Sequence, residues 1–119
     1  MNFLIMAIFI GSFQVTAYRS VPYQTRERGY FWTASGDRVN SKGIAVSQDL
    51  LAKNGGPFSY GDLVYVEHIG FKYVNDTMNK RITKHLDVWV GTYAEEKAFD
   101  KTFKGRSLNI WILRYRKEK

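Results

Sequence analysis

Two aspartates, Asp76 and Asp87, have the positions in this chain that point most clearly to chemistry. Asp87 interrupts an apolar run, Leu86 to Val90 (LDVWV), that is typical of a β-strand. Aspartate is depleted in strands and is seldom fully buried without a partner, so Asp87 needs either a structural partner or a chemical task. Burial would raise the pKa of this carboxyl group toward neutrality, which is what a general acid requires.

A structural role is the competing interpretation of Asp87. The residue would then lie on the solvent side of a two-faced strand, or would pair with Arg81 or Lys84. His85 and Trp89 lie two residues to either side of Asp87 and therefore on the same face of an extended strand. For His85 the alternatives are a metal-binding or acid–base role and a partly exposed structural histidine. For Trp89 they are the floor of a binding subsite and a core residue.

A β-rich scaffold is expected to position these groups. Apolar and alternating runs predict strands at residues 13–18, 43–46, 63–69, 71–75, 86–90 and 108–113. One or two helical turns are predicted over residues 47–53, and a helix is predicted over residues 92–103 with Thr92 as its cap. Six short strands with one or two short helices predict a mainly β fold, a small six-stranded barrel.

Composition narrows the classes of function. The chain has 119 residues, enough for one domain with its own core. The absence of cysteine excludes a disulfide scaffold, a thiol nucleophile and a cysteine-ligated metal, and with only two histidines no metal or other cofactor is predicted. A net charge of +7 predicts an anionic partner such as a cell-wall polymer, nucleic acid or a lipid surface. Nucleic acid is disfavoured because an RNA-type aromatic strand signature is absent and the basic residues are spread along the chain.

Five motifs occur in the order in which the three-aspartate (3D) domain family carries them. They are Thr16-Ala17-Tyr18, Thr33 to Gly36, Gly43 to Val46, the hairpin Gly61 to Gly70, and Asp76-Thr77 followed eleven residues later by Asp87-Val88-Trp89. The chain resembles this family from about residue 13 to 113. The family is related to the catalytic domain of membrane-bound lytic transglycosylase A and to stationary-phase survival proteins. The resemblance implies a double-psi β-barrel and peptidoglycan as substrate.

Two positions depart from the family pattern. The first family aspartate is replaced by Ser47, and Asp49 would substitute for it only if the chain bends back. The Gly-Gly pair that usually follows Asp-Thr is Met78-Asn79, which changes the flexibility of the loop. Neither departure removes the two aspartates that the resemblance places in the active groove.

The resemblance implies a lytic transglycosylase that cleaves the β-1,4 bond between MurNAc and GlcNAc. Asp87 would protonate the glycosidic oxygen and then accept the proton of the C6 hydroxyl, which closes a 1,6-anhydro ring. Asp76 would keep the pKa of Asp87 high or orient the site. Groove-lining and substrate-binding candidates are Thr16, Tyr18, Ser35, Thr77, Lys80 and Trp89. A non-catalytic module that binds or remodels peptidoglycan on the same barrel is the alternative.

The two ends of the chain are expected to lie outside the barrel domain of residues 13–113. Within residues 1–12, the apolar run Phe3 to Ile10 is too short to span a bilayer but fits a signal-peptide core or a lipid-facing anchor. A buried terminal strand or helix is the other interpretation. Residues 114–119 are expected to be a frayed basic tail. Export to the periplasm or cell wall, or delivery there by a phage, is the expected localisation, with membrane contact through residues 3–10 as one option.

Overall fold

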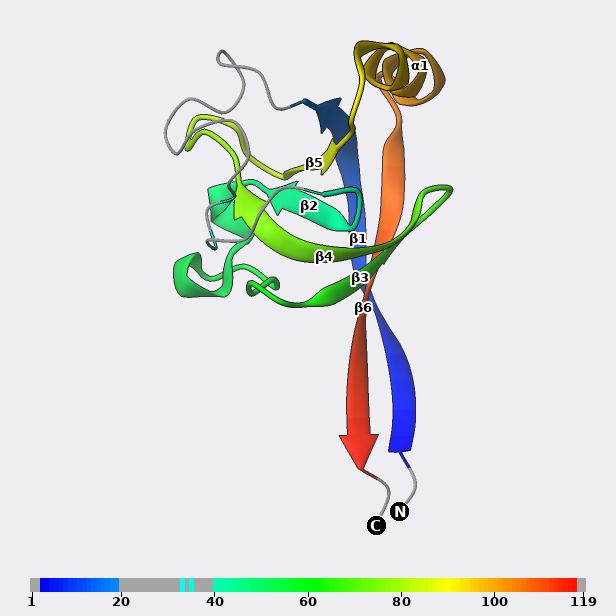
Figure 1. Ribbon diagram of the computed structural model, residues 1–119. Helices are drawn as coiled ribbons and strands as arrows, with labels where there is room; N and C mark the ends of the chain where they lie inside the picture. Colours follow the sequence, from blue (N-terminus) through cyan, green and yellow to red (C-terminus); the bar gives the residue numbers. More distant parts are fainter. Residues whose placement is uncertain (1–2, 20–32, 34, 36–39, 118–119) are drawn as a thin grey trace.

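Six strands close into a barrel, with one helix across one end (Figure 1). The computed structural model describes residues 3–19, 33, 35 and 40–117. The strands are β1 (Phe3–Tyr18), β2 (Gly43–Val46), β3 (Leu63–Val66), β4 (Gly70–Thr77), β5 (His85–Trp89) and β6 (Ser107–Lys117), and the helix is α1 (Tyr93–Phe103). Two 3-10 turns, η1 (Gln48–Leu50) and η2 (Ala52–Asn54), follow β2. The mainly β, six-stranded barrel predicted from the sequence is confirmed.

The strand order around the ring is β1-β5-β2-β4-β3-β6. Two of the pairs, β1–β5 and β2–β4, are parallel, and the other four are antiparallel. Exchanging β1, β2 and β3 for β4, β5 and β6 maps every pair onto a pair of the same direction. The barrel therefore consists of two equivalent halves, each of which contributes one strand to each parallel pair, as a double-psi topology requires.

The barrel interior is filled by branched aliphatic side chains, which suit a pleated surface. Ile44 and Val46 of β2 and Leu86 and Val88 of β5 belong to this core, together with Phe58 from the segment after η2. Along β5 these core residues alternate with His85, Asp87 and Trp89, so the polar side chain at position 87 lies on the opposite face. The alternation explains how a charged residue sits in the middle of an apolar sequence.

The helix α1 begins at the residue that the sequence predicts. The Thr92 hydroxyl accepts a hydrogen bond from the backbone N–H of Glu95 and donates to the Glu95 carboxylate, at 3.1 and 3.0 Å. These bonds satisfy an N–H group that the first turn of a helix leaves without a partner. Within the part of the chain that the structure describes, no helix is long and apolar enough to cross a membrane.

The two ends of the chain pair with each other: the N-terminal apolar run forms a strand, one of the predicted alternatives but an exposed one, and the C-terminal tail differs from its predicted structure. β1 begins at Phe3 rather than Phe13, and its first residues pair with β6, from Phe3 opposite Lys117 to Phe9 opposite Trp111. The expectation of a frayed tail is therefore wrong for residues 114–117, because these residues form the other strand of a ribbon that runs out of the barrel (Figure 1). Residues 118–119 lie outside the described residues.

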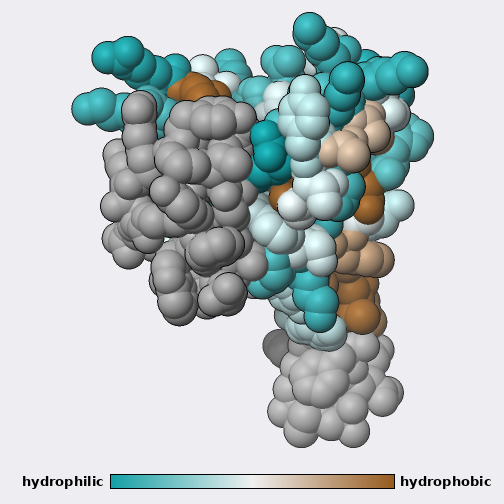
Figure 2. All heavy atoms as spheres, turned by 45° about the horizontal axis from the view of Figure 1, so that its top comes forward, coloured by the Kyte–Doolittle hydropathy of each residue, from teal (hydrophilic) through white to brown (hydrophobic). Residues whose placement is uncertain are grey.

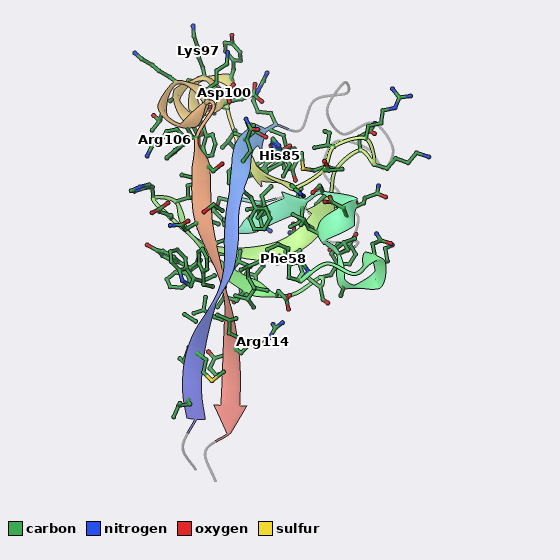
Figure 3. The ribbon with its side chains drawn as sticks, turned by 180° about the vertical axis from the view of Figure 1, so that it is seen from behind. Phe58, His85, Lys97, Asp100, Arg106 and Arg114 are labelled. Carbon is green, nitrogen blue, oxygen red and sulfur yellow. The ribbon has the colours of Figure 1, made fainter. Side chains whose placement is uncertain are left out.

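The ribbon makes the molecule long, with extents of 49 × 29 × 25 Å. A bulge between Phe9 and Gly11 separates the ribbon from the part of β1 that belongs to the barrel. At the base of the ribbon, the Arg114 guanidinium forms an ion pair with Asp62 at 3.0 Å (Figure 3). β1 thus has a barrel half and a ribbon half, divided at the bulge.

Candidate active site

Four residues lie in one row across four neighbouring strands. Thr16 of β1 is opposite Asp87 of β5, Asp87 is opposite Ala45 of β2, and Ala45 is opposite Asp76 of β4. Directly paired residues point to the same face of a sheet, and the neighbours of Ala45 and Asp87 along their strands fill the core. Both carboxyl groups therefore project from the outer face, on either side of an alanine. Two strand spacings put their Cα atoms about 10 Å apart.

Thr16 holds the carboxyl group of Asp87. The Thr16 hydroxyl lies 2.8 Å from Oδ1 of Asp87 and donates to it. Burial raises the pKa of Asp87 to about 7; the Thr16 bond opposes this rise, and the negative charges of Glu96, Asp76 and Asp100 add to it. Asp87 is consequently about half protonated at neutral pH, the condition under which one carboxyl group serves as acid and base.

His85 completes the hydrogen bonding of Thr16. Its Nε2 atom lies 2.8 Å from the Thr16 hydroxyl oxygen, and His85 is drawn on β5 in Figure 3. Burial lowers the pKa of His85, so the ring is neutral at pH 7. Because the single hydroxyl proton of Thr16 goes to Asp87, the Nε2 of His85 is the donor in this bond. His85 is thus a positioning residue that orients the Thr16 hydroxyl.

Asp76 is held from two sides. The Tyr18 hydroxyl donates to its Oδ2 atom at 3.1 Å, and the backbone N–H of Thr77 donates to its Oδ1 atom at 2.9 Å. Burial and the negative charge of Asp76 raise the pKa of Tyr18, so the phenol keeps its proton and remains a donor. Thr16 and Tyr18, two residues apart on β1, therefore hold one aspartate each.

The remaining predicted residues lie at different distances from this row. The backbone N–H of Ser35 donates to the carbonyl of Asn75, the residue before Asp76, at 3.2 Å, so this exposed turn lies beside the site. Thr77 follows Asp76 at the end of β4, and Lys80 lies in an exposed turn three residues farther along the chain. Tyr30 and Trp32 precede the Thr33 to Gly36 motif in the sequence, where they are candidates either for stacking on a sugar or for packing, and both lie outside the described residues.

Ser47, which replaces the first family aspartate, has a structural role. It is fully buried, its hydroxyl accepts the N–H of His85 at 3.0 Å, and its own N–H donates to the His85 carbonyl at 2.8 Å. Asp49 does not take the place of the missing aspartate, because its carboxylate accepts the backbone N–H of Lys84 at 3.0 Å. These bonds hold the beginning of β5, and hence His85, in position.

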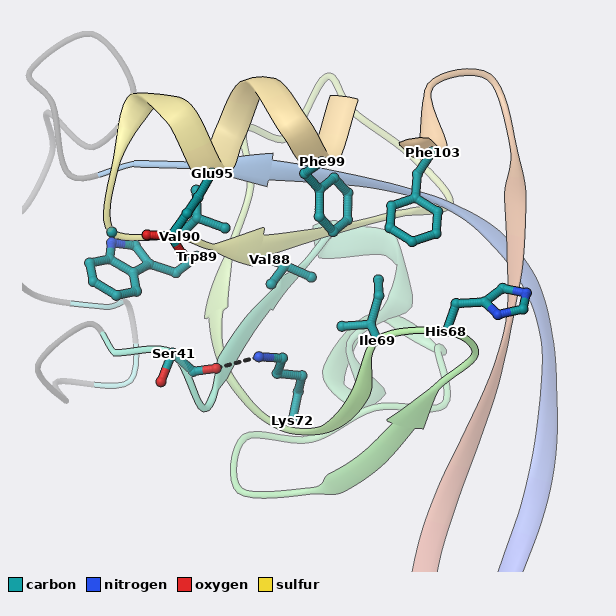
Figure 4. Close-up of a pocket in the computed structure, with 11 residues that line it drawn as sticks. Ser41, His68, Ile69, Lys72, Val88, Trp89, Val90, Glu95, Phe99 and Phe103 are labelled. Atoms are coloured by element: carbon teal, nitrogen blue, oxygen red, sulfur yellow. Dashed lines mark hydrogen bonds between the residues drawn. The ribbon is translucent and has the colours of Figure 1, made fainter. Parts of the chain in front are cut away.

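Trp89 lines a neighbouring cavity of about 480 Å³ under α1 (Figure 4). In that view Phe99 and Phe103 point down from α1, and the Lys72 ammonium reaches across to the Ser41 carbonyl, to which it donates a hydrogen bond. Burial lowers the pKa of this ammonium group. Trp89 is not a core residue, because its indole is only partly buried.

The sequence interpretation did not single out Ala45, the residue at the centre of the row. Its signal was a small side chain between Ile44 and Val46, where a strand normally carries a larger one. Ala45 is 3% exposed and contributes only a methyl group between the two carboxyl groups. No group of three or more potential metal ligands occurs among the residues that the structure covers.

No protein-family model matches this chain, and no curated protein matches it. Any assignment of function therefore rests on the geometry and electrostatics of the row.

Proposed function

We propose that this protein is a lytic transglycosylase that cleaves peptidoglycan glycan strands. The observation that carries the proposal is the pKa of Asp87 near 7, on an outer face where Asp76 projects to the same side. A half-protonated carboxyl group can give a proton to a leaving oxygen and then act as a base in the same turnover. The resemblance to the 3D domain family supplies the substrate, the bond between MurNAc and GlcNAc.

In the first step, the Asp87 proton moves to the glycosidic oxygen as the bond to C1 of MurNAc breaks. In the second step, the C6 hydroxyl oxygen of the same sugar bonds to C1 and its proton returns to Asp87. One carboxyl group suffices because the nucleophile belongs to the substrate and needs no bound water. The Thr16 hydroxyl, held by His85, keeps the acting oxygen of Asp87 in place between the two steps.

Asp76 has a supporting role in this proposal. Its two oxygens accept hydrogen bonds from Tyr18 and from the Thr77 backbone, an arrangement that favours a carboxylate anion. Such an anion stabilises positive charge on the sugar ring in an oxocarbenium-like transition state, and it opposes deprotonation of Asp87. This role differs from that of the second carboxylate in a hydrolase, which activates water.

A non-catalytic module that binds or remodels peptidoglycan is the second candidate. The observation that favours it is Ser47 at the position of the first family aspartate, because this serine is buried and supplies no carboxyl group. Both candidates have the same partner, the glycan strands, and both require delivery to the cell wall by export or by a phage. Product analysis distinguishes them.

The test is digestion of purified sacculi followed by mass spectrometry of the released fragments. The proposal predicts 1,6-anhydro muropeptides from the wild-type protein and none from Asp87→Asn. Asp62→Asn is the matched control: it changes an aspartate outside the row, which pairs with Arg114 of the ribbon, and it should leave the product yield unchanged. Reducing-end products would identify a muramidase instead. Binding to sacculi without any cleavage would identify the non-catalytic module.

A further inference from the structure

The ribbon formed by the outer halves of β1 and β6 exposes apolar side chains on both of its faces. Ile5 and Phe9, with exposed fractions of 61% and 55%, point to one face, and Leu4 and Ile8 point to the other. In Figure 2 hydrophobic side chains gather where the narrow part of the molecule leaves the barrel. Contiguous exposed apolar surface of this kind marks an interaction site.

One edge of the ribbon also lacks a backbone partner. Among the described residues, β5 pairs with β1 only from Gln14 to Tyr18, so the edge of β1 from Phe3 to Phe13 has no neighbour there. That stretch, FLIMAIFIGSF, contains no charged residue and no proline, the devices that normally protect an edge strand. The outer end of β6, by contrast, has the sequence RYRK. The β1 edge is therefore the one suited to strand pairing.

A lipid surface fits these observations less well than another protein strand. Both edges of a two-stranded ribbon carry N–H and C=O groups without partners, and in hydrocarbon each such group costs several kcal/mol, about the amount that burying one apolar side chain returns. An isolated two-stranded ribbon is also only marginally stable in water. A partner that extends the sheet satisfies the backbone groups and covers apolar side chains at the same time.

The cationic end of β6 decides between the ways in which two copies could meet. Pairing through the β6 edges would bring Arg114, Arg116 and Lys117 of one copy against the same residues of the other. Pairing through the β1 edges places those residues on the two outer sides of a four-stranded sheet. Like charges on directly opposed strands are destabilising, so the uncharged β1 edge is favoured.

We propose that the protein forms a two-fold symmetric homodimer in which the ribbon halves of the two β1 strands pair antiparallel. A two-fold axis brings the same surface of both subunits together, and an antiparallel pair of identical strands meets this condition. The tip of each ribbon then lies against the base of the partner's ribbon. A hollow of about 490 Å³ lies beside the ribbon, between Ile5 and Tyr115 of the ribbon and Leu63 of β3.

The first test is sedimentation equilibrium of the purified full chain without lipid or detergent. The proposal predicts a particle of twice 13.8 kDa. Ile5→Lys should raise the dimer dissociation constant by at least about tenfold, because it puts charges on facing strands. Ile82→Lys is the matched control, since Ile82 is exposed at 38% in a loop outside the ribbon, and it should leave the dissociation constant unchanged. A wild-type monomer at all concentrations would overturn the proposal.

A second test does not depend on a charged variant that folds. The chain has no cysteine, so a single introduced thiol reports only its own surroundings. Ala7→Cys, in the middle of the ribbon half of β1, should form a disulfide-linked dimer under mild oxidation. Ala94→Cys, on the exposed surface of α1, should remain monomeric on a denaturing gel. Equal cross-linking of the two variants would contradict the proposal, and so would a monomer that binds anionic vesicles through the ribbon.

Discussion

The two halves of β1 put the same strand to opposite uses. In the barrel half, Thr16 and Tyr18 lie in the stretch of β1 that pairs with β5, and each donates a hydrogen bond to an aspartate. In the ribbon half, Ile5 and Phe9 are exposed, and β6 is the one neighbour of that half among the described residues. The bulge between Phe9 and Gly11 divides the halves.

The difference shows what a closed barrel provides for chemistry. Asp87 lies on β5, which has a paired strand on each side, and burial is the main cause of its raised pKa. The ribbon has the more hydrophobic sequence, yet it excludes little water because, among the described residues, both of its edges and both of its faces are open. Hydrophobic sequence alone therefore does not create a buried environment; closure of the sheet does.

The largest expected difference between a variant beside the barrel half of β1 and a variant in the ribbon half is in the pH dependence of the free energy of unfolding. The pKa of Asp87 is about 7 in the folded protein and 3.8 in the unfolded chain. Between these values the folded state binds more protons, so the free energy of unfolding falls as the pH rises from about 4 to 7. Asp87→Asn removes this loss and should be the more stable protein at pH 8, by at most about 4 kcal/mol, with the advantage vanishing near pH 4.

Denaturant unfolding at several pH values measures this effect. A ribbon variant such as Ile5→Ala removes no titrating group and should show the same pH dependence as the wild type. If Asp87→Asn also followed the wild-type pH dependence, the claim that Asp87 is buried beside the barrel half of β1 would be refuted.

The next effect concerns packing. Val15, in the barrel half, is 2% exposed and belongs to the core, so Val15→Ala should cost about 2 kcal/mol of the free energy of unfolding. Ile5→Ala, in the ribbon half, should reduce the free energy of unfolding by about 0.5 kcal/mol or less when it is measured at protein concentrations below the dimer dissociation constant. Chemical denaturation of both variants checks the comparison, which fails if the two costs are equal.

A smaller effect is expected from the hydrogen bond to Asp87. Thr16→Val keeps the shape of the side chain but removes the hydrogen-bond donor to Asp87. The rate of glycan cleavage should fall about tenfold, because a hydrogen bond to a charged group contributes about 1.5 kcal/mol. Because this bond lowers the pKa of Asp87, its loss should also move the alkaline limit of the pH–rate profile upward. A merely structural role of Thr16 would lower the rate without moving that limit.

Ser12→Ala is the control for Thr16→Val on the same strand. Ser12 donates its hydroxyl hydrogen bond to Asn109, away from both aspartates, so the variant should leave both the rate and the profile unchanged. A shifted profile for Ser12→Ala would mean that β1 acts on Asp87 as a whole strand rather than through one hydroxyl.

The smallest effect is expected from charge on α1. Asp100 is exposed on the helix, and its negative charge contributes to the raised pKa of Asp87. Asp100→Asn should therefore shift the alkaline limit of the pH–rate profile slightly downward, opposite in direction to Thr16→Val. High salt should abolish the difference between wild type and variant, because charges separated by solvent are screened.

The amino-acid sequence was sufficient to predict the features of the fold that depend on local patterns. A short apolar run predicted the strand at Gly43–Val46 with its observed bounds, and Thr92 with Glu95 and Glu96 predicted the start of α1. The six-stranded barrel followed from the number and length of the runs. Such features could be predicted because each depends on residues that are neighbours along the chain.

Features that depend on long-range pairing could not be predicted in this way. The run Phe3 to Ile10 and the charged segment from Arg114 suggest two independent ends, and only their pairing across more than a hundred residues makes them one ribbon. The spacing of eleven residues between Asp76 and Asp87 does not reveal Ala45 between them, since β2 precedes both in the sequence. The partners of the aspartates likewise come from the beginning of the chain.

The most direct test of the central claim is the titration of the Asp87 carboxyl carbon by NMR spectroscopy. We predict a midpoint near pH 7 for Asp87. Asp49 is an internal reference: burial tends to raise its pKa, but hydrogen bonds from Ser47 and the Lys84 N–H outweigh this and leave it below the ordinary value. An Asp87 midpoint close to that of Asp49 would show an ordinary surface carboxylate and would contradict its role as the acid.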